Sequence, residues 1–151
     1  MTSTQPERIT VGALSVRFLV ESDDSNGTVC MFECGVPANA QMPMAHSHDA
    51  FEETVFGLSG CTTYTVAGET IELNPGDSTC IKRGVVHGFA NHGDVDATFL
   101  AIISPALFGA QYFRDVGAVL AAAAGGPPDK AALGAIMREH GLTPAPPPPS
   151  A

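Results

Sequence analysis

Short runs of alternating apolar and polar residues occupy the middle of the chain, and turn-forming residues separate them. Alternation with a period of two is typical of strands that are buried on one face. The runs are rich in Thr, Val, Ile and Phe and cover residues 28–34, 54–58, 62–66, 70–73 and 98–103. Turn signals such as Asn74-Pro75-Gly76-Asp77 lie between them, because proline presets φ and glycine accepts a positive φ. Regularly spaced short strands predict a β-sandwich or barrel over residues 13–104.

The spacing of apolar residues changes from that of strands to that of helices after Pro105. Apolar side chains recur every three or four residues in two stretches, Phe113, Val116 and Leu120 in the first and Leu133, Ile136 and Met137 in the second. The first stretch predicts a helix over residues 107–123. The second predicts a helix that begins at residues 127–129 and ends at Gly141. Both apolar faces need a surface to cover, so we expect a helical extension over residues 105–142 that packs against the barrel.

Both ends of the chain lack side chains that would anchor them. Residues 1–12 are polar and are expected to form a flexible N-terminus. Residues 143–151 are proline-rich, and proline donates no hydrogen bond to a sheet, so a disordered polyproline-like tail is expected there. The first ten residues lack the basic start and apolar stretch of a secretory signal. The sequence is therefore expected to belong to a cytoplasmic protein.

Composition and charge narrow the functional classes. Hydrophobic residues make up 44% of the chain and charged residues 15%, so a sizeable core can form and wholesale disorder is excluded. The formal net charge of −9 repels phosphate backbones and anionic lipids, so neither nucleic acid nor a membrane is expected as a partner. The 4 cysteines contain no C-x-x-C pair and are expected to be free thiols.

Three histidines and one glutamate form a pattern that suits metal binding. His46 and His48 are two residues apart, so on a strand both side chains point to the same face. Glu53 is expected to add an oxygen from the following strand, and His87 a third nitrogen from a strand farther along. Such a set suits one divalent transition metal ion (Fe, Ni, Mn, Co or Zn) and leaves positions open for water, substrate or dioxygen. The alternative is that His46 and His48 are surface loop histidines.

These residues resemble the two sequence motifs of the cupin superfamily. The histidine pair, the glutamate and the closing glycine of the first motif are matched by His46, His48, Glu53 and Gly60, whereas Ala40 replaces the opening glycine. The second motif is matched by Gly76, Gly84, His87 and Asn91, whereas Lys82 replaces its proline. The resemblance implies a mainly β fold, the double-stranded β-helix or cupin jelly-roll barrel, here followed by two C-terminal helices. It also implies one bound metal ion and a homodimer.

The segment after the barrel resembles the single-domain cupins described as quercetin 2,3-dioxygenase-like. Ser104-Pro105 leads into an aromatic segment with Phe108 and Tyr112-Phe113-Arg114, and the second helix ends in His140-Gly141. This resemblance implies an oxygenase in which Glu53, besides binding the metal, is the catalytic acceptor of a substrate proton.

Strand parity separates neighbouring candidates. Glu52 and Glu53 cannot both face inward, and the spacing to Gly60 favours Glu53, which leaves Glu52 solvated or paired with a cation. By the same parity Met44 shares a face with His46, and Phe89 shares a face with His87. Three residues are therefore the preferred substrate-pocket candidates, with core packing as the alternative for each: Met44, Phe89 and, as a plug of the barrel mouth, Phe113. His92 and His140 are expected to be exposed.

Taken together, these features predict a metal-dependent dioxygenase that acts on a small aromatic or enol-bearing substrate. Two alternatives use the same site. One is a metal-dependent isomerase or lyase that needs no dioxygen, and the other is a non-catalytic cupin that binds a small ligand. Oxygen consumption separates the first two readings, and binding without turnover supports the third.

Overall fold

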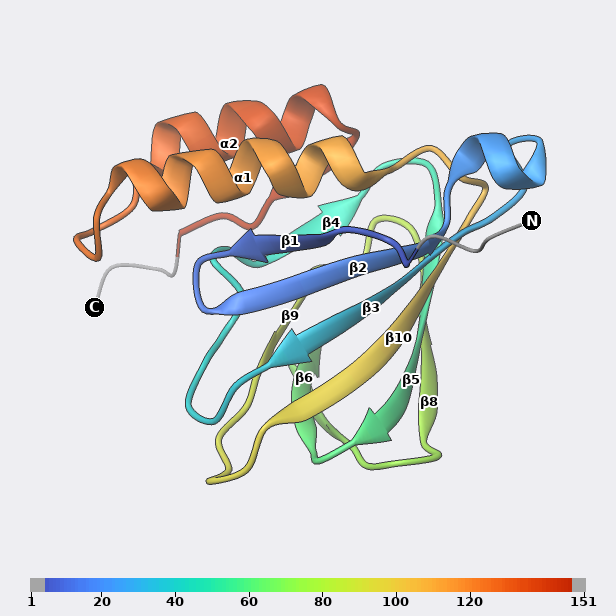
Figure 1. Ribbon diagram of the computed structural model, residues 1–151, viewed down its shortest axis with the longest axis horizontal. Coiled ribbons are helices and arrows are strands. Elements are labelled where there is room, and N and C mark those ends of the chain that lie inside the picture. The colour runs from blue at the N-terminus through green and yellow to red at the C-terminus, as the bar shows by residue number, and fades with distance from the viewer. Residues whose placement is uncertain (1–4, 148–151) are drawn as a thin grey trace.

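The strands of the protein form two antiparallel sheets that face each other (Figure 1). The computed structural model describes residues 5–147. In chain order the elements are β1 (Arg8–Val11), β2 (Leu14–Val20), the 3-10 helix η1 (Ser22–Ser25), β3 (Cys30–Val36), β4 (His46–His48), β5 (Glu52–Ser59), β6 (Thr62–Val66), β7 (Glu69–Leu73), β8 (Ser78–Ile81), β9 (His87–Ala90), β10 (Ala97–Ser104), α1 (Ala110–Ala122), α2 (Lys130–Glu139) and β11 (Leu142–Pro144).

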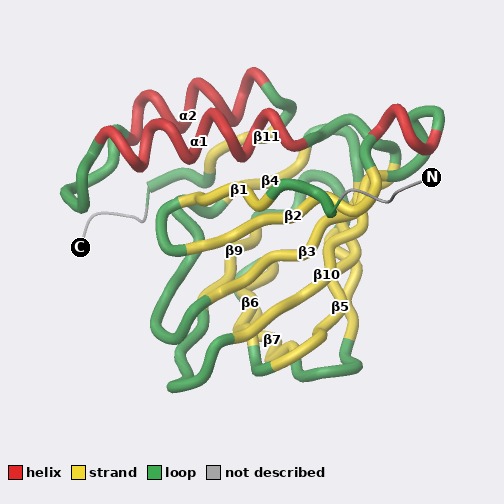
Figure 2. The backbone as a smooth tube through the Cα atoms, viewed as in Figure 1, coloured by secondary structure: helices red, strands yellow, loops and turns green. Residues whose placement is uncertain are grey.

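The chain crosses repeatedly from one sheet to the other. The six-stranded sheet has the order β1-β2-β3-β10-β5-β8, and the five-stranded sheet has the order β11-β4-β9-β6-β7. From β3 to β10 the chain therefore visits the two sheets in turn, with the β6–β7 hairpin as the one pair of consecutive strands in the same sheet. This mainly β arrangement with two helices confirms the predicted fold class, a double-stranded β-helix. Figure 2 shows the strands gathered below the two helices.

Alternation along the strands places the core between the sheets. In β3 the side chains of Cys30, Phe32, Cys34 and Val36 are buried, and the intervening residues are half-buried. The paired strand β10 shows the same pattern, with Phe99, Ala101 and Ile103 buried. Each inner face contributes apolar side chains to one continuous core, as sheet-on-sheet packing requires.

Two glycines of the matched motifs allow tight turns at the ends of strands. Gly60 has φ +62°, and a Cβ at this position would lie 2.5 Å from the carbonyl oxygen of Asp96. Gly76 has φ +90° in the turn between β7 and β8. Residues with a side chain rarely adopt this backbone region, so glycine is required by conformation at both positions and by close contact at the first.

The two helices lie side by side along one end of the barrel, next to β1 and β4 (Figure 1). Helix α1 packs against β1 and against α2, and α2 packs against β11. The Asp129 side chain caps α2 by accepting a hydrogen bond of 3.0 Å from the Ala132 N–H. Both predicted helices are confirmed, although α1 begins three residues later than expected. None of the helices in residues 5–147 has the length and apolar character needed to cross a bilayer.

The prediction of a flexible N-terminus up to residue 12 is wrong for Arg8–Val11. These residues form β1, which pairs antiparallel with β2 in the register Arg8↔Arg17 to Val11↔Leu14. Ile9 and Val11 turn inward and are buried. Four residues with two inward apolar side chains are enough for a strand when a neighbouring strand and a helix cover them.

The prediction of a disordered tail from residue 143 is wrong for the first residues of that segment. Thr143 and Pro144 belong to β11, which pairs with Ser47 and His46 of β4. The Ala145 N–H then donates a hydrogen bond of 2.9 Å to the Ala45 carbonyl. Proline is tolerated because β11 is the edge of its sheet, where one side of the strand needs no donors. The end of the predicted tail, residues 148–151, lies outside the described residues.

Candidate metal centre

Three imidazoles meet on the inner face of the five-stranded sheet. His46 and His48 stand at the two ends of β4, and His87 is the first residue of β9. The register pairs His46 directly with His87. The two-residue spacing in β4 and the antiparallel pairing with β9 therefore bring all three side chains to one place. All three are buried, so the alternative of surface loop histidines is excluded.

The three rings are close enough to share one ion. The distances between ring centroids are 5.2 Å for His46 and His48, 4.9 Å for His46 and His87, and 4.6 Å for His48 and His87. One nitrogen from each ring lies within 4.8 Å of the others, a grouping that could hold a metal ion. Glu53 is beside this group and not a member of it.

Backbone carbonyls fix the orientation of two of these rings. Nδ1 of His46 is 3.2 Å from the Met44 carbonyl, and Nδ1 of His87 is 3.0 Å from the Val85 carbonyl. A carbonyl can only accept, so Nδ1 carries a proton in both rings, and in the neutral form of each ring Nε2 keeps its lone pair for a metal ion. Nδ1 of His48 is buried without a partner, and this ring stacks on Phe51 at 4.5 Å.

Burial keeps two of the imidazoles uncharged. It lowers the pKa of His46 to about 3, with the nearby His87 and His48 adding to the effect. It also lowers the pKa of His48 to about 4, although Glu53 opposes the shift. For His87, burial acts in the same direction, but the hydrogen bond and negative charge of Glu53 outweigh it and raise the pKa. Neutral imidazole is the form that binds metal ions.

Glu53 and Glu52 point to opposite sides of β5. Glu53 is 8% exposed, and its Oε2 lies 3.4 Å from Nε2 of His87 and 3.7 Å from Nε2 of His48. Burial would raise the pKa of Glu53, but the hydrogen bond to His87 and the nearby histidines lower it below its ordinary value. Glu52 faces outward and forms an ion pair with Arg83 at 2.6 Å. Strand parity therefore identifies Glu53 as the inward glutamate. Of the two expectations for Glu52, solvation or pairing with a cation, the structure shows the pair with a cation.

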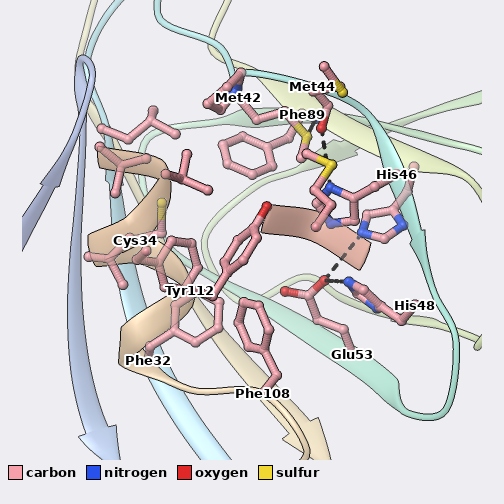
Figure 3. A pocket seen from close by; sticks show the side chains of 18 of the residues that line it. Phe32, Cys34, Met42, Met44, His46, His48, Glu53, Phe89, Phe108 and Tyr112 are labelled. Carbon is pink, nitrogen blue, oxygen red and sulfur yellow. Dashed lines mark hydrogen bonds and ion pairs between the residues drawn. The ribbon is translucent and has the colours of Figure 1, made fainter. Parts of the chain in front are cut away.

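An apolar cavity of about 60 Å³ opens from the histidines toward the helices (Figure 3). Its lining includes the three pocket candidates Met44, Phe89 and Phe113. Aromatic rings form much of the wall, with Phe32 and Phe113 at a centroid distance of 5.1 Å and Phe108 and Phe113 at 5.3 Å. The volume is far below the roughly 300–1,000 Å³ of pockets for drug-sized ligands. The cavity therefore suits a small molecule and not a drug-sized one.

Both tyrosines of the chain line the cavity as well, and sequence reasoning did not assign either one to the site. Tyr64 lies on β6, within the run of residues 62–66 that predicts a strand. Tyr112 is four residues before Val116, and both are buried on the inner face of α1. The spacing of four was a usable signal, but the predicted stripe began at Phe113, which is only half-buried.

The remaining candidates lie outside the metal centre. His92 is exposed. His140 is half-buried rather than exposed, because its Nε2 lies 3.0 Å from Oδ2 of Asp115 on α1. Asn91 is buried and has a structural role, since its amide donates to the carbonyls of Val36 and Val95.

We expect the metal-free protein to lose stability as the pH falls from about 6.5 toward 4. His46 and His48 have folded-state pKa values of about 3 and about 4 against an ordinary 6.5, so in this range the unfolded chain binds protons that the folded protein does not. The raised pKa of His87 acts the other way, but it is one group against two. Urea unfolding at a series of pH values measures the slope. His46→Gln should flatten it and His92→Gln should not, and a free energy of unfolding that rises on acidification would contradict the assignment.

The comparisons with known proteins agree with this architecture. Residues 32–103, just under half of the chain, match the family described as Cupin domain. No curated protein matches the chain in sequence.

Solved structures with the same fold belong to proteins with different names and described activities. A predicted oxalate decarboxylase from Thermotoga maritima is 21% identical, with TM-score 0.60 over 67% of this chain and 92% of its own. The polyketide cyclase RemF from Streptomyces resistomycificus is 23% identical, with TM-score 0.59 over 69% of this chain and 79% of its own. A sugar phosphate isomerase from Silicibacter pomeroyi is 20% identical, with TM-score 0.58 over 66% of this chain and 71% of its own. These likenesses establish the cupin fold, and with the matched domain they support the cupin superfamily, a fold that hosts many reactions.

Proposed function

We propose that this protein is a metal-dependent dioxygenase that acts on a small aromatic or enol-bearing molecule. The observation that carries the proposal is the placement of three imidazoles and one buried carboxylate at one end of a cavity walled by aromatic side chains. The resemblance of the segment after the barrel to quercetin 2,3-dioxygenase-like cupins favours oxygenase chemistry over the other reactions that the fold hosts.

The donor set fits a divalent transition metal ion. His46, His48 and His87 would hold the ion through Nε2, and two of these rings already have the Nδ1–H···O=C support that is common behind metal-bound histidines. Glu53 would either be the fourth ligand of the ion or lie next to the ion without binding it. Fe, Ni, Mn, Co and Zn all suit such nitrogen and oxygen ligands. When bound, the ion supplies a Lewis acid with open positions for a substrate oxygen and dioxygen.

In this proposal Glu53 would accept a proton from the substrate. The lowered pKa makes its carboxylate anionic at neutral pH, and its burial leaves it few competing water partners. A phenol or enol that enters the cavity would bring its hydroxyl to the end where Glu53 and the histidines lie. Removal of that proton gives the electron-rich oxyanion that reacts with dioxygen more readily than the neutral form.

Oxygen uptake tests the proposal. Protein loaded with each candidate metal is expected to consume dioxygen with at least one member of a panel of phenols and enols. Glu53→Gln should lower turnover by at least about 100-fold, as loss of a general base does. The matched control Glu52→Gln should keep the activity, because Glu52 faces Arg83 on the outside.

The other outcomes of this assay identify the alternatives. Product formed without oxygen uptake would replace the dioxygenase with an isomerase or lyase that uses the same centre. Tight binding of a panel member with no product from any metal form would indicate a non-catalytic ligand-binding cupin.

A further inference from the structure

Two tyrosines line a cavity whose other side chains, away from the metal centre, are nearly all apolar. The chain contains 2 tyrosines, and both Tyr64 and Tyr112 line this cavity. Among the residues that the structure describes, its lining includes no serine, threonine, asparagine, glutamine, lysine or arginine. Apart from the metal centre, the polar side chains of the lining are those of these two tyrosines and Cys34.

Tyr64 holds a buried hydroxyl that has no hydrogen-bond partner. Its side chain is 1% exposed, and its ring is wedged between Phe89 at 5.4 Å and Phe99 at 5.5 Å. A phenylalanine would fill the same space without the cost of an unsatisfied polar group. A tyrosine at this position is therefore informative, because buried hydroxyls in proteins nearly always have a partner.

Tyr112 reaches into the cavity from helix α1. Its ring leaves helix α1 and packs against Phe108 at 4.8 Å and Phe113 at 5.2 Å. Figure 3 shows its hydroxyl oxygen at the inner end of the side chain, pointing into the cavity toward the side of His46 and Glu53. The aromatic neighbours hold the ring, so the hydroxyl has a defined position.

Both hydroxyls remain protonated at neutral pH and can therefore donate. Burial raises the pKa of Tyr64 and of Tyr112, and the negative charge of Glu53 raises each of them further. A neutral phenol is a good donor to a carbonyl or hydroxyl oxygen.

We propose that Tyr64 and Tyr112 donate hydrogen bonds to an oxygen of the substrate, and that the substrate is an uncharged aromatic or enolic compound with at least two oxygen functions. One oxygen would lie at the histidines and Glu53, and a second, a carbonyl or hydroxyl, would lie at the tyrosines. The inference rests on the proposed function only in placing the reacting oxygen at the metal centre.

The charge of the cavity argues against anionic substrates. With no lysine or arginine in its lining, a carboxylate or phosphate at the tyrosine end would be buried without a cation, and the Glu53 carboxylate would repel it. The aromatic walls instead suit the faces of a planar ring.

Three probes of similar shape test this inference: 4-hydroxyacetophenone, which has a neutral carbonyl across the ring from its hydroxyl, 4-ethylphenol, which lacks the carbonyl, and 4-hydroxybenzoate, which is charged there. Binding is measured by calorimetry on protein loaded with Zn²⁺, which has no redox chemistry and so prevents turnover. We expect the ketone to bind about tenfold more tightly than 4-ethylphenol, and 4-hydroxybenzoate to bind most weakly.

Phenylalanine variants identify the donors. Tyr64→Phe and Tyr112→Phe should each weaken ketone binding by at least about threefold and leave 4-ethylphenol unchanged, since only the ketone offers the acceptor. Tyr64→Phe should also melt no lower than the parent protein, because it removes an unsatisfied hydroxyl. Equal affinity of the parent for the ketone and 4-ethylphenol, failure of both to bind, or a ketone preference that survives both substitutions would overturn the inference.

The two proposals fail separately. A tyrosine-dependent preference for the ketone together with no oxygen uptake by any metal form would reject the dioxygenase and support the tyrosine contacts. Oxygen uptake with no such preference would do the reverse.

Discussion

A chain that ends at Gly141 is expected to melt about 5–24 °C below the full chain and to bind its metal ion at least about tenfold more weakly. The deletion removes β11, which is short but lies directly against the strand that carries His46 and His48. Strand β4 has β9 as its other neighbour, and the ladder between them pairs only His46 with His87. Without β11, most of the ordered pairing of β4 is lost.

The size of the Tm shift follows from the buried side chain and the hydrogen bonds that the deletion removes. Leu142 is fully buried, which contributes roughly 1.5–3 kcal/mol. The Thr143 hydroxyl donates to Asp49 at 2.7 Å, and the Ala145 N–H donates to Ala45 at 2.9 Å, each contributing about 0.5–1.5 kcal/mol. The total of about 2.5–6 kcal/mol corresponds to the expected shift in Tm, at about 2–4 °C per kcal/mol for a chain of this size.

A chain that ends at Pro147 is the matched control. It keeps Leu142, Thr143 and Ala145 with all the contacts just described, so its Tm and metal content should equal those of the full chain. Calorimetric melting and elemental analysis of the three chains measure both effects. If the chain ended at Gly141 matched the other two, β11 would have no part in holding the metal strand.

The tail shows where sequence reasoning reached its limit. A strand of three residues is too short to show a period of two, and its composition, Leu-Thr-Pro followed by more proline, is typical of an exposed segment. What makes it a strand is a partner, the open edge of β4, which is separated from it by about one hundred residues of sequence. The same holds for β1, whose inward residues Ile9 and Val11 need β2 and α1 to cover them.

The metal-site residues were predictable because strand geometry acts on them locally. The spacing of His46 and His48 fixes a shared face, and the adjacency of Glu52 and Glu53 fixes opposite faces, without knowledge of the rest of the fold. That His87 lies near His46 and His48 in space does not follow from local strand geometry. The resemblance to the cupin motifs supported this expectation. The spacing to Val116 is a local signal that Tyr112 lies on the buried face of its helix. No local signal shows that either tyrosine lines a cavity, because whether an aromatic side chain fills the core or lines a cavity depends on the packing of its neighbours.

Replacing His87 with alanine is expected to lower metal affinity by more than about 100-fold, a larger loss than the 10–100-fold typical of residues that only support a ligand. His87 contributes one of three nitrogens that lie within 4.8 Å of one another, and no other histidine of the described residues approaches the group. The neighbouring cavity wall is apolar, so it offers no nitrogen to replace the one that is lost with His87.

Thermal melting gives this prediction a second readout. A bound ligand at 100 times its Kd stabilises a protein by about 2.7 kcal/mol, so added metal should raise the Tm of the parent protein by several degrees and leave that of His87→Ala unchanged. His92→Ala and His140→Ala are the controls, since His92 is exposed and His140 pairs with Asp115 away from the centre. Both should keep the metal-dependent rise. Full metal occupancy in His87→Ala, or loss of occupancy in His92→Ala, would show that the ion binds somewhere other than the three buried imidazoles.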